Sequence, residues 1–249
     1  MYYDPMISKL VTWGKDRNEA LDLLDNAFDE YVVQGVAHNI GFGKSIVANQ
    51  SFRDGDYSTA FIPDFYPEGY NGDDLTSKDK QVLALAAHQL KNEHSTYYTF
   101  GDAQRSTDIQ DHTLFVTIVG KGEEADHDWK VVMHPGTNDF TITDLDNGES
   151  TTLDLTNFNF SRNTLVEMET NKGADNDIIQ LMGSENDLKF NFYYQGGKVE
   201  TYVYNENQFK YKQHMAPPTK IDFSKSILSP MPGAIVSVSV EVGQTVADG

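Results

Sequence analysis

One helical stretch constrains the fold of this chain more than any other feature. Residues 78–94 read KDKQVLALAAHQLKNEH, and Thr76 and Asp79 stand where a capping box would begin the helix. The apolar side chains spread over a wide arc of the helix: Val82, Leu83, Ala86, Ala87 and Leu90. An arc this wide is typical of a helix that is enclosed by other structure. The sequence therefore predicts that this helix is wrapped by the segments that follow it.

Short strand patterns fill the rest of the chain up to residue 214. They cover residues 112–120, 129–134, 139–143, 150–155, 163–170, 177–182, 188–195, 198–204 and 209–214. Residues 146–148 (Asp-Asn-Gly) and 195–197 (Gln-Gly-Gly) are hairpin turn signals. Eight or nine strands at hairpin spacing fit an up-and-down antiparallel barrel or a β-sandwich. We favour a barrel of about eight strands around the central helix, because that helix needs an enclosure.

Helices dominate the first part of the chain, which makes the fold class α+β. The pattern of residues 2–13 predicts an extended segment that ends at Gly14. Asp16 is a good N-cap for an amphipathic helix that we expect to end at Gly35, with Glu19 in the capping-box position. Residues 36–52 resemble a second helix, and the glycines at 41 and 43 weaken its start. Residues 53–75 are rich in Gly, Pro and Asp and predict an ordered loop.

Composition excludes several classes of function. The 249 residues carry a formal net charge of −19, so phosphates would be repelled, and we expect neither nucleic acid nor a membrane as a partner. The chain has no cysteine, which excludes a disulfide scaffold, a cysteine-based zinc site and a thiol nucleophile. No apolar run approaches the ~20 residues of a membrane-spanning helix.

Metal and calcium sites receive little support from the residue pattern. His127 and His134 flank a predicted strand at a spacing of seven, which places them on opposite faces if the strand is regular. His88 and His94 are six apart on the helix, which is not a ligand spacing. Residues 144–149, DLDNGE, are similar to a calcium loop, but a hairpin turn explains the same residues. We therefore predict no metal site.

The last part of the chain has the pattern of an unfinished β module. Residues 215–228 have the composition of a linker, which the two prolines at 217 and 218 would stiffen. Residues 229–249, SPMPGAIVSVSVEVGQTVADG, alternate like a strand and then turn at Gly243. An edge this long and apolar requires further strands.

Both ends of the sequence resemble one family, the biotin-dependent acyl-CoA carboxylases. YYDPMISKLVTWGKDRNEAL resembles the end of their biotin carboxylase domain, and SPMPGAIVSVSVEVGQTVADG the start of their biotin carboxyl carrier domain. GVAHNIGF and GDYSTAFIPDFYPEGYNG are most similar to the propionyl-CoA carboxylase α-subunit branch, rather than to the methylcrotonyl-CoA branch. The stretch from residue 78 to 214 resembles the family's middle (BT) domain by pattern, a helix surrounded by an antiparallel barrel.

This resemblance implies that the chain is a central segment of a mitochondrial or bacterial cytoplasmic ligase subunit. The implied parts are the carboxylase C-terminal part (1–52), a connecting loop (53–75), the BT domain (76–214), a linker (215–228) and a truncated carrier domain (229–249). The parent enzyme uses biotin, ATP and magnesium, and its carrier lysine would lie beyond Gly249, since no Ala-Met-Lys-Met-type hairpin occurs here. We therefore expect no catalytic, cofactor or metal residue in the chain and no bound cofactor. The implied partners are the carboxyltransferase β subunit and the remainder of the α subunit.

Two stretches leave structural and functional roles open. Residues 2–6, YYDPM, would fill a core strand of the parent or support the carboxylase site from a distance. Residues 64–70 are rich in aromatic side chains, which suit packing and partner contact equally. A free-standing barrel that binds a small apolar ligand is the alternative to an assembly segment, and a barrel interior without the helix would favour it.

Overall fold

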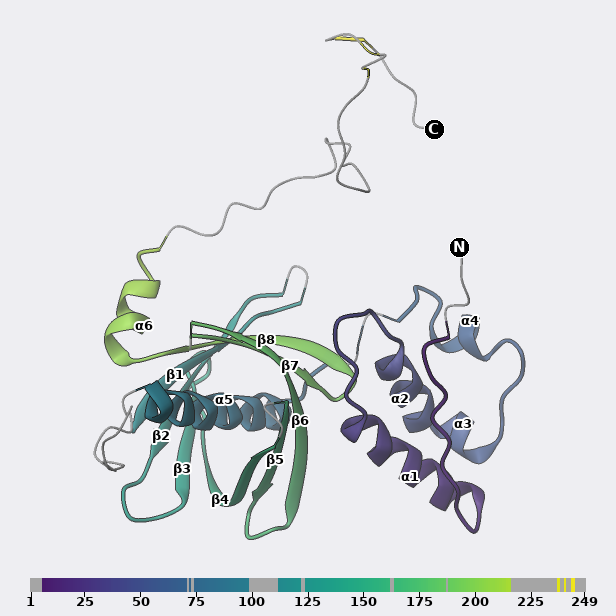
Figure 1. Cartoon of the computed structure of the whole chain (residues 1–249), viewed down its shortest axis with the longest axis horizontal. Helices are drawn as coiled ribbons and strands as arrows, with labels where there is room; N and C mark the ends of the chain where they lie inside the picture. Colours follow the sequence, from purple (N-terminus) through teal and green to yellow (C-terminus); the bar gives the residue numbers. More distant parts are fainter. Residues whose placement is uncertain are drawn as a thin grey trace. The chain divides into compact units, whose positions relative to one another are not determined.

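The structure is a computed structural model that describes residues 6–70, 72, 74–98, 112–121, 124–161, 164–186, 188–215, 237, 240, 243 and 244. The chain divides into two compact units, Met1–Gln213 and His214–Gly249. All of the helices and strands below belong to the first unit (Figure 1). Most of the predicted linker and carrier segment therefore falls outside the described residues, and those two predictions stay predictions, as do the bounds of the five implied parts.

Four helices come before the barrel in the sequence. They are α1 (Arg17–Glu30), α2 (Ile40–Ala48), α3 (Gln50–Asp54) and α4 (Phe61–Phe65). Asp16 caps α1 as predicted, since its side chain accepts a hydrogen bond from the Glu19 amide. The Glu19 carboxylate, however, accepts from the Lys15 amide and not from the cap residue.

The bounds of the first helices differ from the prediction for local reasons. Helix α1 ends at Glu30, five residues before Gly35, because Tyr31 turns to an extended backbone. The predicted second helix splits at Asn49, whose side chain accepts from the Ser51 and Phe52 amides and so begins α3. The predicted loop contains α4, and its proline is tolerated because it lies in the first turn.

The stretch before α1 is not a strand. In the described part of the predicted extended segment, residues 6–14 pair with no strand. Its alternate residues Leu10 and Thr12 are half-buried, and the Thr12 hydroxyl donates to the Ala20 carbonyl of α1. The later part of this segment therefore lies along α1, with Val11 and Trp13 exposed on either side of Thr12.

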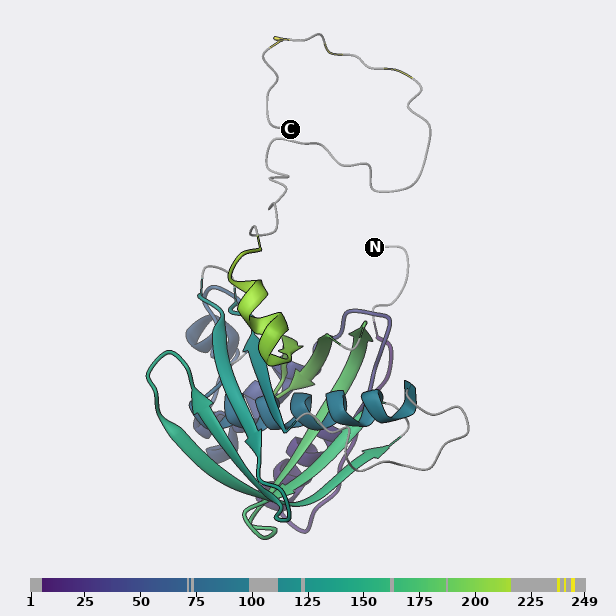
Figure 2. The same cartoon turned by 90° about the vertical axis from the view of Figure 1, so that its left-hand side faces the viewer.

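Helix α5 (Ser77–Tyr98) is enclosed as the sequence predicts. Residues 82–87 are each at most 1% exposed. Successive residues of a helix are 100° apart, so six consecutive buried side chains point in every direction around the axis. The predicted capping box is also present, because Asp79 Oδ2 accepts from the Thr76 amide and Thr76 Oγ1 from the Asp79 amide. Figure 2 shows the strands curving around this helix.

Eight antiparallel strands form the closed barrel. They are β1 (Thr113–Ile118), β2 (His127–Met133), β3 (Asp139–Asp144), β4 (Ser150–Ser161), β5 (Leu165–Thr170), β6 (Asp175–Glu185), β7 (Lys189–Tyr194) and β8 (Gly197–Tyr204). Each strand pairs with the next one in sequence, and β8 returns to pair with β1. The predicted turn at Gln195 and Gly196 has positive φ at both residues, as a two-residue hairpin requires. The barrel is therefore up-and-down, and the sandwich is excluded.

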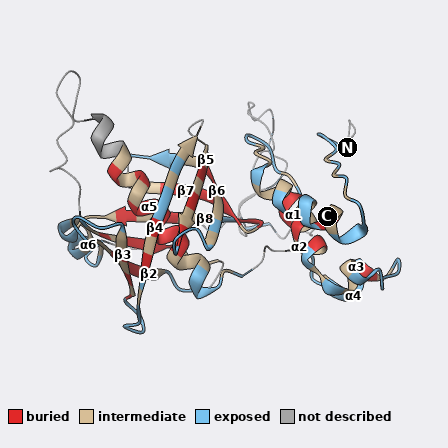
Figure 3. Ribbon diagram, turned by 90° about the horizontal axis from the view of Figure 1, so that it is seen from below, coloured by how far each residue is buried: buried red, intermediate tan, exposed pale blue. Residues whose placement is uncertain are grey.

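The barrel interior is a packed core. Its largest fully buried side chains from the strands include Trp129, Phe190, Phe192, Met168 and Ile142. They pack with the buried residues of α5 into one hydrophobic cluster, seen as the red stretches of Figure 3. The helix therefore occupies the space that a small-ligand barrel would keep open.

The ninth predicted strand is wrong, because residues 206–212 form the helix α6 (Glu206–Lys212). Asn205 and Gln208 make a reciprocal capping box that begins this helix. In addition, β8 already pairs with β1, so the closed barrel has no edge for another strand.

Candidate assembly site at the joint between helices and barrel

A buried glutamine of the barrel caps the end of α1. Gln180 of β6 is 2% exposed, and its Nε2 donates to the Asp29 carbonyl at 2.8 Å and to the Tyr31 carbonyl at 3.4 Å. The last carbonyls of a helix have no partner within the helix. The barrel therefore supplies the partner that ends α1 at this position, and helix and barrel are tied by a buried polar contact.

Two glycines allow α2 to touch the β7–β8 turn backbone to backbone. A Cβ atom added to Gly41 would lie 1.9 Å from the Gly196 carbonyl oxygen. A Cβ atom added to Gly196 would lie 3.1 Å from Gly41 Cα. No larger residue fits at position 41 unless helix and turn separate. We call these contacts of α1 and α2 with β6 and the β7–β8 turn the joint.

Side chains around the two glycines extend the joint. Gln34 Nε2 donates to the Leu181 carbonyl at 3.2 Å. The rings of His38 and Tyr193 meet edge to face with centroids 5.3 Å apart. Burial, together with the nearby charge of Lys198, lowers the pKa of His38. The joint thus combines an aromatic pair with the hydrogen bonds of Gln34 and Gln180.

A charged pair fixes α2 on α1 next to the joint. Lys44 Nζ lies 2.6 Å from Asp29 Oδ2 and 3.5 Å from Asp25 Oδ1. Burial raises the pKa of the Asp29 carboxyl, and the Lys44 ammonium opposes this effect. The pair holds the two helices at the place where the Asp29 carbonyl meets the barrel.

A second polar cluster pins the start of α5 to the barrel. The Tyr194 hydroxyl donates to Asp177 Oδ1 at 2.6 Å and lies 3.5 Å from Asp79 Oδ1. Beside it, Lys78 Nζ lies 2.6 Å from Asp175 Oδ1. Burial raises the pKa of the Asp177 carboxyl, and burial with this hydrogen bond raises that of Tyr194. The cluster joins α5, β6 and β7 at one end of the barrel.

The aromatic stretch around α4 is mainly packing, with an exposed part. The Phe61 ring contacts those of Phe52, Phe65 and Tyr66 with centroids 4.8–6.3 Å apart. Phe61 is buried, whereas Ile62 and Phe65 are exposed. Packing and partner contact, the two roles that the sequence allows for residues 64–70, therefore both remain supported.

An apolar row is exposed before α1. It consists of Ile7, Val11 and Trp13, which are separated by even spacings of four and two residues. Trp13 is 79% exposed. Such a row on a segment without strand partners is typical of a surface that another polypeptide covers.

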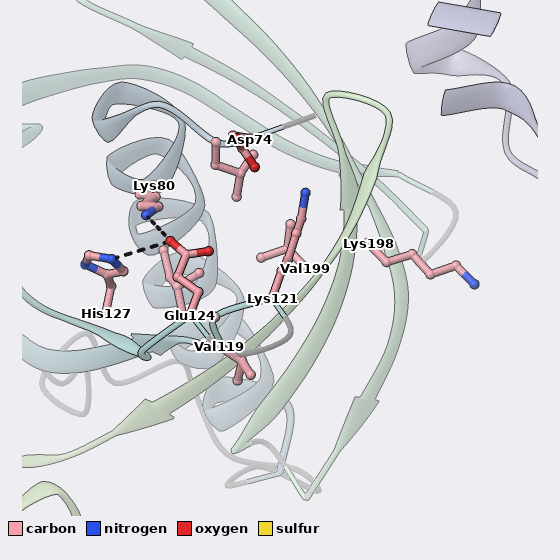
Figure 4. A pocket seen from close by; sticks show the side chains of 11 residues that line it. Asp74, Lys80, Val119, Lys121, Glu124, His127, Lys198 and Val199 are labelled. Atoms are coloured by element: carbon pink, nitrogen blue, oxygen red, sulfur yellow. Dashed lines mark ion pairs between the residues drawn. The ribbon is translucent and has the colours of Figure 1, made fainter. Parts of the chain in front are cut away.

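A small pocket at the barrel rim contains charged groups that already have partners (Figure 4). The pocket measures ≈ 50 Å³. Glu124 Oε1 lies 3.6 Å from Lys80 Nζ and 3.8 Å from His127 Nε2, and Lys198 points away from this cluster. Glu124 thus already contacts Lys80 and His127, and the small volume of the pocket leaves little room for a substrate.

The histidines weighed as metal ligands do not come together. His134 Nε2 lies 2.7 Å from Thr141 Oγ1, and His127 Nδ1 lies 3.1 Å from Asp146 Oδ2. His88 is buried against the Phe140 ring. Among the described residues, no three His, Asp or Glu side chains gather as metal ligands. The placement of the His94 side chain and of residues 2–5 lies outside the described residues.

The calcium-like stretch is a hairpin turn. Asp144 Oδ1 accepts from the Asp146 amide at 2.9 Å, and Asn147 Oδ1 accepts from the Glu149 amide at 2.7 Å. The carboxylate and amide oxygens thus accept hydrogen bonds from backbone amides of their own turn, which connects β3 and β4.

Sequence reasoning missed the two residues that matter most in the joint. For Gly41 the sequence predicts only a weakened helix start, although a glycine in a helix start often marks a close approach. Gln180 is the one polar residue within the apolar run IIQLM, residues 178–182, and this interruption is the signal that the sequence offers.

Comparison with known proteins relates the whole chain to one group. Residues 1–64 match the family described as biotin carboxylase C-terminal domain. The propionyl-CoA carboxylase alpha chains of Caenorhabditis briggsae and Mus musculus, both mitochondrial, are each 32% identical to it over 100% of this chain. This chain is similar along its whole length to propionyl-CoA carboxylase alpha chains. It spans about a third of their length, 34% and 33% respectively.

A related carboxylase is also similar, at lower identity. The methylcrotonoyl-CoA carboxylase subunit alpha of Dictyostelium discoideum is 29% identical over the whole chain, which covers 35% of that relative. The match to the carboxylase C-terminal family covers α1 to α3 and most of α4, so the joint connects this region with the barrel. In the described part of the chain, every helix is too short or too polar to span a lipid bilayer.

Proposed function

We propose that this chain is the non-catalytic assembly segment of a propionyl-CoA carboxylase α subunit. The observation that carries the proposal is the joint, where a carboxylase-like helical region meets a helix-filled barrel through Gly41, Gly196 and Gln180. A barrel whose interior is packed has no room for a substrate, whereas a backbone-to-backbone contact is suited to hold two parts in fixed relation. The whole-length similarity to these α chains supports the same reading.

The parent enzyme, with its β subunit, would carboxylate propionyl-CoA to methylmalonyl-CoA using ATP, bicarbonate and biotin. The family resemblance assigns biotin, ATP and magnesium to parts of the parent outside this chain, and the sequence has no Ala-Met-Lys-Met-type hairpin that would carry biotin. This chain would keep the two active sites of the parent in a fixed relation, because a tethered carrier that visits two sites works only if both stay within its reach.

The remainder of the α subunit is the first expected partner, and the exposed row at Ile7, Val11 and Trp13 supports this assignment. The carboxyltransferase β subunit is the second, and we assign its contact to the barrel and the loops around α5. The animal relatives are mitochondrial proteins, which supports a mitochondrial matrix location in a eukaryote. In a bacterium we expect a cytoplasmic location.

Association with a β subunit tests this proposal. The 249-residue chain should bind a propionyl-CoA carboxylase β subunit at micromolar concentration in sedimentation velocity or interferometry. An unrelated protein of similar negative charge serves as the control for non-specific attraction. Absence of association at micromolar concentrations would count against the assembly role.

The methylcrotonyl-CoA branch is the alternative within the family, since one such relative also matches the whole chain. The same experiment with a methylcrotonyl-CoA carboxylase β subunit separates the two branches, and stronger binding there would overturn the propionyl-CoA assignment. A free-standing ligand-binding barrel would instead show binding of a fluorescent fatty acid, which the packed interior argues against.

A further inference from the structure

Helix α6 is a short helix that depends on the barrel for its order. It has seven residues, and none of them is buried. Isolated helices of this length are unstable in water, even with a capping box such as that of Asn205 and Gln208. The contacts that α6 makes with β1, β2 and β8 must therefore keep it folded.

An aromatic stack forms the first of these contacts. The rings of Phe209 and Phe115 of β1 lie 4.4 Å apart at an angle of 11°. The Phe209 ring also meets Tyr204 of β8 at 6.4 Å. β1 and β8 are the two strands that close the barrel, so α6 contacts both strands of the closing pair. Figure 1 shows it at the end of the barrel next to β1.

A single lysine makes the second contact at the other end of α6. Lys212 Nζ donates to Asp128 Oδ1 of β2 at 2.6 Å and to Thr117 Oγ1 of β1 at 2.7 Å. The same ammonium lies 5.4 Å from the Phe209 ring centre and 5.8 Å from that of Tyr204. Thr117 lies on the outward face of β1, the same face as Phe115, and yet it is only 1% exposed. The last residue of α6 therefore covers the barrel surface as well as pairing with it.

We propose that α6 is a fixed anchor that sets where the chain after residue 213 leaves the barrel, with Phe209 and Lys212 as its positioning residues. This inference rests on the proposed function, in which that part of the chain leads to the biotin carrier. With α6 docked, the tether begins at residue 214 and has ~15 residues, 214–228. With α6 released, it would begin at residue 206 and have ~23 residues. The effective concentration of a tethered module falls roughly as the −3/2 power of tether length, so release would dilute the carrier about twofold.

Hydrogen exchange of the 249-residue chain tests whether these contacts hold α6. In the double variant Phe209→Ala/Lys212→Ala, the amides of α6 should exchange faster while those of β1 and β8 stay protected. Tyr211→Ala is the matched control, because Tyr211 is 71% exposed on the same helix. The conservative variant Phe209→Tyr/Lys212→Arg keeps the stack and the charge and should retain protection. Unchanged exchange in the alanine variant would overturn the anchor.

Kinetics of the full-length α subunit with its β subunit test what the anchor does. The alanine variant should lower the rate of propionyl-CoA carboxylation about twofold and leave ATP-dependent carboxylation of free biotin unchanged, because free biotin needs no tether. An unchanged coupled rate despite faster exchange would overturn the inference, and so would an equal loss in both reactions. If the unaltered enzyme fails to carboxylate propionyl-CoA, the proposed function fails, while the exchange experiment still decides whether α6 is anchored.

Discussion

At the scale of single residues, Gly41 allows α2 to approach the barrel more closely than any residue with a side chain would. Gly41→Ala should destabilise the chain by about 1–3 kcal/mol, because the new methyl group must push the Gly196 carbonyl away. Urea unfolding of the 249-residue chain measures this. Gly183→Ala is the control, since its Cβ would meet only Asn191 Nδ2 at 4.0 Å. Equal effects of the two substitutions would show that Gly41 has no special role.

Gln180 contributes the buried hydrogen bonds of the joint. Gln180→Met has a similar volume but no donor, so the Asp29 and Tyr31 carbonyls would lose their partner at a cost of about 1–3 kcal/mol. Gln81→Met is the matched control, because its amide donates only to the Thr151 hydroxyl at 3.3 Å in a half-buried place. A loss no larger than that of the control, measured by urea unfolding, would contradict the capping role.

Asp177 gives the chain a specific pH dependence. Burial raises its pKa above the ordinary value of 3.8, against the smaller effects of the Tyr194 hydroxyl and Lys78, while Asp175 and Asp79 add to the rise. The folded chain thus holds this proton more tightly than the unfolded chain does. The stability it contributes is present below pH ~4 and is lost as pH rises through the folded-state pKa.

Asp177→Asn should therefore be more stable than the unaltered chain at pH 7, with a difference that shrinks toward pH 4. The amide oxygen of asparagine can still accept from the Tyr194 hydroxyl. Asp64→Asn, at an exposed position, measures the general benefit of removing one negative charge from this acidic chain. A constant difference across the pH range, equal to that of Asp64→Asn, would disprove the burial effect.

At the scale of elements, α5 was the part most accessible to sequence reasoning. Its apolar residues are spread around most of the circumference, and the strands after it alternate at period two, so the barrel and its enclosed helix followed from pattern alone. The end of α1 was misplaced because its stop is a contact with Gln180, far away in the sequence. The predicted ninth strand failed because FKYKQ shows a strand-like alternation, while the capping box and the closed sheet decide for a helix.

Enclosure of α5 makes a prediction that a surface helix would not share. Ala84, Ala86 and Ala87 point in different directions, and each is fully buried. Leucine at any one of these positions should therefore destabilise the chain by about 1–3 kcal/mol. Ala48→Leu, at an exposed position of α2, should have little effect. Thermal unfolding compares the four variants, and tolerance of leucine on one face of α5 would mean that this face is open.

At the scale of the whole molecule, the joint holds the helices and the barrel of the first unit in a fixed relation. We call this rigid unit the bracket. The sequence indicated both a carboxylase-like helical part and a barrel, but it could not indicate that they touch. That contact depends on the absence of one Cβ atom at Gly41 and on one amide group at Gln180, and neither produces a repeating pattern. The sequence alone therefore does not predict this contact, although Gly41 and Gln180 both interrupt the local pattern of their segments.

The distance distribution between the helices and the barrel tests this claim most directly. The chain has no cysteine, so Asn26→Cys on α1 and Thr152→Cys on β4, both at exposed positions, give two clean sites for spin labels. Double electron–electron resonance should give a single narrow distance distribution for this pair, and a broader one when Gly41→Ala is added. A broad or multiple distribution without that substitution would show that the joint is not rigid and would contradict the bracket.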